Sequence, residues 1–170
     1  MFYIRDSVGF YGKMIQDYDD FAVDTSSAHH AINCVTSAFH IAEWIWGDWL
    51  KDDYVTWQKL KISDRHTFLA WLDTAEPWFP VIQDIANGSK HFGNRHLTKF
   101  TNSYVKEGYV EDGYQQRLLE IEVETAGRKP WVEAIIVVKS VVMFWADFLR
   151  QYRPQAQLRK PKHPFTSMPD

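Results

Sequence analysis

The sequence predicts a mainly α-helical single domain, an antiparallel bundle of four or five helices with a small β-hairpin before the last long helix. Long segments repeat apolar residues at helical spacing, whereas residues 101–125 alternate at strand spacing. A chain of 170 residues with 45% hydrophobic content can also bury a substantial core. We therefore expect one domain over residues 1–153, followed by a flexible basic tail over residues 154–170.

The first half of the chain contains the clearest helical pattern. Residues 1–24 mix aromatic residues with aspartate and glycine, so we expect a short helix or loop that covers the core. Ser26 or Ser27 is a good N-cap for a helix to about Lys51. At about 100° per residue its apolar side chains form one broad arc: Ala31, Cys34, Val35, Ala38, Phe39, Ile41, Ala42, Ile45, Trp46 and Trp49.

The opposite side of this helix is a narrow polar stripe formed by His29, Asn33, Thr36, His40 and Glu43. The stripe is nearly uncharged, which is less typical of a freely solvated face than lysine and glutamate would be. We therefore expect it to face a groove or a second subunit.

Another helix is predicted after Asp64, with Phe68, Leu69 and Leu72 as its apolar side. Prolines interrupt the pattern, so residues 76–80 should form a kink or a short connection. A further helical segment is expected from about Val81, ending at Gly88 or Gly93.

The pattern changes over residues 101–125, where Asp112-Gly113 favours a hairpin turn. Three apolar residues alternate there with three glutamates: Leu119, Ile121 and Val123 with Glu120, Glu122 and Glu124. This alternation predicts a strand with one side packed against the core and the other side exposed to solvent. Pro130 suits the first turn of a last, centrally buried helix that extends to about Tyr152.

Composition limits the possible functions only broadly. A net charge of −3 gives no global attraction to nucleic acid or to an anionic membrane, so such binding needs a local patch. The single cysteine, Cys34, excludes an intrachain disulfide, and the first residues lack a secretory pattern. No uncharged apolar stretch reaches the length of about 18 residues that a bilayer requires. We therefore expect a cytoplasmic protein outside the membrane.

The segment from Ile85 to Phe92 concentrates small, polar and cationic groups, and any chemistry is expected there. If the helix continues to Phe92, then Asp84, Asn87 and His91 share a sector of about 60°, with Lys90 beside them. The carboxylate would orient the imidazole, the amide would position a phosphate or sugar hydroxyl, and the ammonium would balance negative charge.

Two other interpretations of this segment remain open. In one, Asn87-Gly88 caps the helix, Lys90 is solvated and His91 makes a structural hydrogen bond. In the other, Gly88 breaks the helix, and the resulting loop binds an anion through backbone donors and Lys90.

Two long helices followed by Asn87-x-x-x-His91 resemble the HEPN superfamily over residues 26–92. The usual motif in that superfamily has an arginine directly before the polar residue, and here Ala86 occupies that position. The resemblance implies a dimeric module that is either a metal-independent ribonuclease or a noncatalytic RNA-binding or antitoxin-like relative. It implies no cofactor, and it gives Asn87 and His91 as motif residues. With Asp84 and Lys90, which helical spacing places beside them, these are the candidate catalytic residues.

A metal-binding bundle is an alternative function. His40 and Glu43 are three residues apart on one helix, and His29, His91 and His96 are further potential ligands. No tight paired motif fixes a geometry, so we expect no bound metal.

The basic tail from Arg150 onward is either a solubilising segment or a salt-sensitive contact to RNA or another acidic surface.

Taken together, these observations favour an intracellular HEPN-like module, expected to be a homodimer, that engages RNA, a nucleotide or a protein partner around Asn87, Lys90 and His91. Whether it is an enzyme stays open at this point. A noncatalytic protein-interaction module, antitoxin-like or structural, is the second hypothesis.

Overall fold

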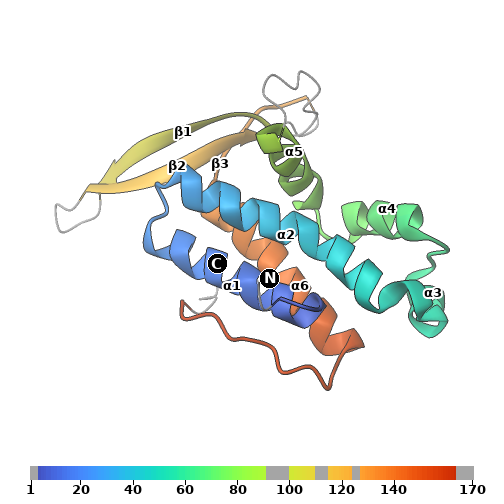
Figure 1. The fold of residues 1–170 in the computed structure, drawn as a ribbon. Coiled ribbons are helices and arrows are strands. Elements are labelled where there is room, and N and C mark those ends of the chain that lie inside the picture. The colour runs from blue at the N-terminus through green and yellow to red at the C-terminus, as the bar shows by residue number, and fades with distance from the viewer. Residues whose placement is uncertain (1–3, 91–99, 110–114, 124–126, 164–170) are drawn as a thin grey trace.

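The computed structural model describes residues 4–90, 100–109, 115–123 and 127–163. In these ranges the chain forms six α-helices, one 3₁₀ helix and a three-stranded sheet, which confirms the mainly helical fold with a hairpin before the last helix (Figure 1). The elements are α1 (Ser7–Val23), α2 (Ala28–Asp48), η1 (Leu50–Asp52), α3 (Tyr54–Leu60), α4 (Arg65–Ala75), α5 (Phe79–Lys90), β1 (Phe100–Tyr109), β2 (Gln115–Val123), β3 (Trp131–Glu133) and α6 (Ala134–Tyr152).

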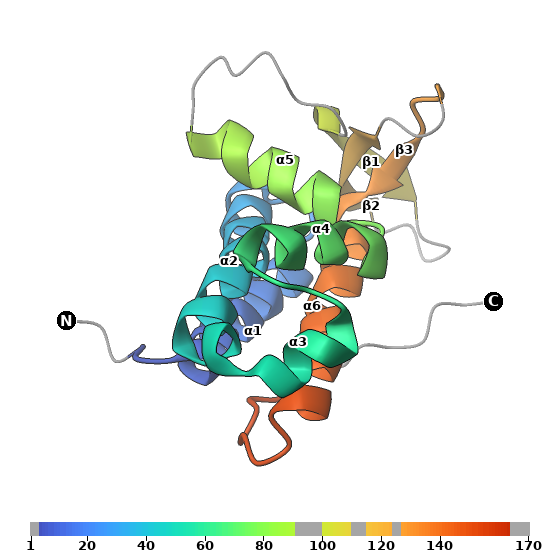
Figure 2. The same cartoon turned by 90° about the vertical axis from the view of Figure 1, so that its right-hand side faces the viewer.

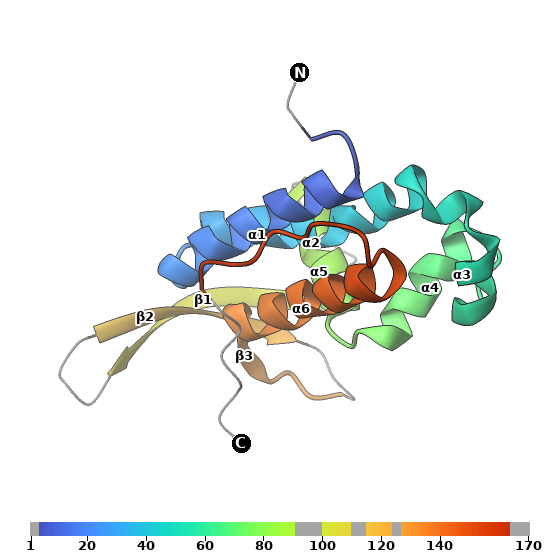
Figure 3. The same cartoon turned by 90° about the horizontal axis from the view of Figure 1, so that it is seen from below.

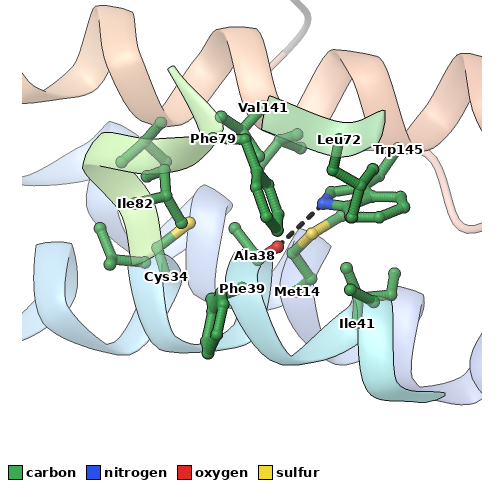
Figure 4. Close-up of a cluster of buried hydrophobic side chains, with 14 of the residues drawn as sticks. Met14, Cys34, Ala38, Phe39, Ile41, Leu72, Phe79, Ile82, Val141 and Trp145 are labelled. Carbon is green, nitrogen blue, oxygen red and sulfur yellow. Dashed lines mark hydrogen bonds between the residues drawn. The ribbon is translucent and has the colours of Figure 1, made fainter. Parts of the chain in front are cut away.

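Three long helices form the centre of the fold. In Figures 1 and 3, α1 runs antiparallel to both α2 and α6, with the sheet at one end of this layer and α3 and α4 at the other. The core lies between the helices, and the indole Nε1 of Trp145 in α6 donates a 2.8 Å hydrogen bond to the Ala38 carbonyl of α2 (Figure 4). Both residues are fully buried, so this bond joins the two helices inside the core.

Helix α1 is longer than the short helix or loop expected for residues 1–24. Asp6 caps it by accepting a 2.7 Å hydrogen bond from the Gly9 amide. Its buried side chains recur every three or four residues, which places them on one helical face: Tyr11, Met14, Ile15, Tyr18 and Phe21. The aspartates that suggested a loop instead lie between these positions.

Helix α2 matches the prediction closely. Ser27 is the N-cap and accepts a hydrogen bond from the His30 amide. The predicted apolar arc is buried except for Trp46, which is half-buried. The polar stripe has exposed His29 and Asn33 and is half-buried from Thr36 onward. Its exposure agrees with the predicted amphipathic pattern.

The connection after α2 contains two elements that the sequence did not predict, η1 and α3. Trp57 of α3 donates a 2.6 Å hydrogen bond from its indole to the Leu50 carbonyl and stacks on Trp46. Helix α4 begins as predicted, because Asp64 and Thr67 exchange the reciprocal hydrogen bonds of a capping box. Figure 2 shows α3, α4 and α5 following one another along the outside of the helical layer.

The sheet has the order β1-β2-β3, and all its neighbouring strands are antiparallel. The β1–β2 hairpin is the predicted one, whereas its Asp112-Gly113 turn lies outside the described residues. The last helix was predicted to begin at Pro130, but Trp131–Glu133 forms β3 and α6 begins at Ala134. These three residues pair with the edge of β2 that β1 leaves open. This strand pairing overrides the helical spacing of the apolar residues in the sequence.

The face of β2 that carries the glutamates is less exposed to solvent than expected. Leu119, Ile121 and Val123 are buried as predicted, but Glu120 is also buried, with 9% of its surface exposed, and Glu122 is half-buried. Strand β3 pairs with β2 at these positions, with Glu133 opposite Glu120 and Trp131 opposite Glu122.

The C-terminal segment makes defined contacts as far as His163, although residues 154–170 were expected to be a flexible tail. It runs back along α1 (Figure 3). Buried Asp19 of α1 accepts hydrogen bonds on Oδ1 from the amides of Lys162 and His163, at 2.8 and 3.2 Å.

No helix in the described part of the chain combines the length and apolar character that crossing a membrane requires.

Candidate functional site

The start of α5 is fixed by a buried carboxylate. Glu76 accepts 3.1 Å hydrogen bonds on Oε1 from the Trp78 amide and from the Ser140 hydroxyl of α6. Its own carbonyl accepts a hydrogen bond from the Phe79 amide, and Pro80 then occupies the first turn, where no amide donor is needed. The predicted connection over residues 76–80 is therefore a short turn that ties α5 to α6.

Helix α5 has one core face and one polar face. Phe79, Ile82 and Ala86 are fully buried, whereas Asp84 and Asn87 are half-buried. Because the latter two are three residues apart on a helix, their side chains share a face. The structure thus places these two predicted site residues together.

Gly88 lies inside α5 and does not end it, because the helix continues to Lys90. The continuous helix corrects the expectation of a helix end at Gly88 and favours the helical interpretation of the site over the loop. Lys90 is the last residue of α5, and its side chain and the whole of His91 lie outside the described part. The alternative end at Gly93 lies outside it as well.

The electrostatic environment of Asp84 includes a residue that sequence reasoning missed. Asp73 of α4 is exposed, yet it has a raised pKa, first because neighbouring groups partly remove its carboxylate from water and second because Asp84 carries a like charge nearby. No sequence signal marked Asp73, since its approach to Asp84 depends on the turn between α4 and α5. The polar face of α5 is therefore acidic on the side toward α4.

Ala86, which stands where the resemblance to the HEPN superfamily would place an arginine, is fully buried. A residue at this position of α5 points toward the core formed with α2, so it contributes neither charge nor hydrogen-bond donors to the polar face. The bidentate phosphate contact that arginine provides is missing from this position.

The alternative metal site is not assembled in the described residues. Glu43 is engaged by Arg65 in a two-bond ion pair, in which Nε and Oε2 are 2.8 Å apart. The His40 ring packs against Phe39 with centroids 5.2 Å apart. No group of three or more potential ligands comes together in the part of the chain that the structure describes, and His91 and His96 lie outside it.

Comparison of the chain with family models, with curated proteins and with solved structures finds no match.

Proposed function

We propose that this protein is a HEPN-like module that binds RNA without cleaving it, around Asn87, Lys90 and His91. The observation that carries the proposal is the continuity of α5 through Gly88 to Lys90. Asp84 and Asn87 share a partly accessible face of α5. The continuity carries this helix on to Lys90, immediately before His91.

The charge of the chain that follows Asn87 supports a contact with RNA phosphates. Residues 88–99 contain Lys90, Arg95 and Lys99 together with two histidines and no acidic residue. Cations near a phosphate backbone displace its counterions, which makes the resulting affinity dependent on salt. The amide of Asn87 adds donors and an acceptor for a base edge or a 2′-hydroxyl.

The lack of cleavage follows from the groups around the motif. Ala86 offers no guanidinium to the developing negative charge of a phosphoryl transition state, and it is buried. Binding of RNA by the cations then continues without the group that stabilises the transition state.

The proposal includes a cytoplasmic homodimer. The polar stripe on α2 supports the dimer, because His29 and Asn33 are exposed and the neighbouring Ile32 exposes 43% of its surface. Light scattering of the purified protein measures the oligomeric state directly, and a monomeric mass over the micromolar range contradicts the dimer.

Fluorescence anisotropy with labelled single-stranded and hairpin RNAs, in the presence of a metal chelator, tests the proposed function. We expect saturable binding that weakens at least tenfold in the double variant Lys90→Ala/His91→Ala, because the loss of a single charge-assisted contact of about 1.5 kcal/mol already corresponds to a factor of about ten. The variant Lys59→Ala is the matched control, since Lys59 is exposed on α3, away from α5.

Three outcomes separate the hypotheses. RNA that is bound but intact after long incubation supports the proposal. Cleavage that is lost in His91→Ala identifies a ribonuclease instead. The absence of binding to every RNA tested, together with copurification of one specific protein, indicates a protein-interaction module.

A further inference from the structure

A second group of cations is assembled where the chain reverses after α6. The Arg153 amide ends the helix by donating to the Leu149 carbonyl at 2.8 Å, and the Ala156 amide then donates to the Arg153 carbonyl at 2.9 Å. The reversal brings the segment after Pro154 back past the end of α6 (Figure 3). Four cations from both sides of the reversal line one surface cavity of about 240 Å³: Arg150, Arg153, Arg159 and Lys160. We call this cavity the C-terminal cationic pocket.

Two of the guanidinium groups in the pocket are positioned by neutral partners. Arg153 lies over the Trp49 ring, 5.3 Å from its centroid. Arg159 donates to the side chain of Gln16 and to the Gly12 carbonyl. These contacts restrict both side chains without neutralising them, which lowers the entropy cost of binding a ligand there.

Counter-charges in the pocket are few. Arg150 pairs with Asp147 at 2.7 Å, in an exposed and solvent-screened contact. Among the described residues, no carboxylate forms an ion pair with Arg153, Arg159 or Lys160. The lining of the cavity also contains no acidic side chain; its other members are Pro154, Ala156 and Leu158.

The C-terminal cationic pocket is positively charged, whereas the rest of the chain has a net negative charge. Residues 150–163 contain five of the 19 lysines and arginines and none of the 22 acidic residues, so the rest of the chain has 14 cations against 22 acids, a net charge of −8. An anion is therefore attracted to this end of α6 and repelled by the average surface.

We propose that the C-terminal cationic pocket binds the phosphate group of a phosphorylated ligand. Arginine matches phosphate because its fork donates two parallel hydrogen bonds, and Arg153, which forms no ion pair with a described residue, brings such a fork to the cavity. Arg150, Arg159 and Lys160 add positive charge around it. An adjoining cavity of about 340 Å³ shares Arg153, Pro154 and Ala156, and it is also lined by Val8, Tyr152 and Gln155. This mixed apolar and polar space takes the organic group that carries the phosphate. The site is separate from α5 and does not depend on the proposed function.

Isothermal titration calorimetry with pyrophosphate at low ionic strength tests the pocket on the full chain. We expect one saturable site that weakens at least tenfold in Arg153→Gln/Lys160→Gln, because charge-assisted contacts to a phosphate are lost. The double variant Lys51→Gln/Lys59→Gln removes the same total charge from exposed positions of η1 and α3 and should bind as the parent does.

Further variants exclude a purely structural explanation. Arg153→Lys keeps the charge but loses the fork, so its affinity should lie between those of the parent and of the double variant. His91→Ala should leave pyrophosphate binding unchanged, which separates this site from RNA binding at α5. The proposal is overturned if pyrophosphate does not bind saturably, or if both double variants weaken binding equally.

Two ligand pairs identify the source of the phosphate. Tighter binding of adenosine diphosphate than of pyrophosphate indicates a nucleotide whose organic part occupies the adjoining cavity. Preference for a 5′-phosphorylated RNA oligonucleotide over its 5′-hydroxyl counterpart indicates an RNA end. Either preference supports a phosphate site, and both must disappear in Arg153→Gln/Lys160→Gln.

Discussion

Replacing Trp145 with phenylalanine measures the contribution of the contact that joins α6 to α2. The substitution removes the indole donor to the Ala38 carbonyl, a net loss of about 1 kcal/mol for a buried hydrogen bond. It also removes about three ring atoms from a fully buried position, a loss of about 1–2 kcal/mol in burial and packing. Because Ala38 lies in the middle of α2, its carbonyl retains the hydrogen-bond ladder of the helix. The expected total is therefore about 2–3 kcal/mol.

Urea unfolding followed by far-ultraviolet circular dichroism measures this loss without relying on fluorescence from eight tryptophans. The control is Trp44→Phe, because Trp44 is half-buried, stacks on Phe10 at 4.9 Å and donates no hydrogen bond to a described residue. A phenylalanine there keeps the stacking, so the change should stay below about 1 kcal/mol. Equal losses in the two variants, or a loss below about 0.5 kcal/mol for Trp145→Phe, would refute the reasoning.

Two further predictions concern ionisable groups. Burial raises the pKa of Tyr11 and of Tyr18 to about 12, so both stabilise the fold fully below pH 10 and lose that contribution as the pH rises toward 12. In the double variant Tyr11→Phe/Tyr18→Phe, the melting temperature should therefore fall less steeply with pH above pH 10 than it does in the parent protein. An equal slope of melting temperature against pH in the two proteins contradicts this. Partial desolvation and the charge of Asp84 raise the pKa of exposed Asp73, so its charged form is slightly disfavoured in the fold at neutral pH. Asp73→Asn should raise the melting temperature at pH 7 but not below pH 4; a lower melting temperature at pH 7 would argue against this.

The elements that the sequence predicts best are specified by local chemistry. Helix α2 begins at its serine cap, and α4 begins at Asp64, because a side-chain acceptor satisfies free amides of the first turn. The hairpin is equally local, since strand alternation is visible within β2 itself. These signals need no knowledge of the rest of the molecule.

The elements that the sequence misses depend on distant partners. Strand β3 has only three residues, and it exists because β2 offers them an edge, so periodicity favoured an earlier start of the last helix. Helix α3 is seven residues long and is held by the contacts of Trp57 with Leu50 and Trp46. Short elements like these contain too few residues for a period to be recognised.

The candidate site was predictable only in part. The shared face of Asp84 and Asn87 follows from helical spacing, but the sequence left open whether Gly88 ends the helix. Glycine costs about 1 kcal/mol in a helix, an amount that core packing of Phe79, Ile82 and Ala86 easily outweighs. The approach of Asp73 to Asp84 arises from tertiary structure, and no pattern along the chain contains it.

The position of α6 in the chain affects how the protein can be made. Its Trp145 closes the core against a residue 107 positions earlier, so α1 and α2 leave the ribosome long before their common partner exists. Until then their apolar surfaces are exposed to water and to other nascent chains. Overexpression at low temperature or with abundant chaperones should therefore increase the yield of folded protein.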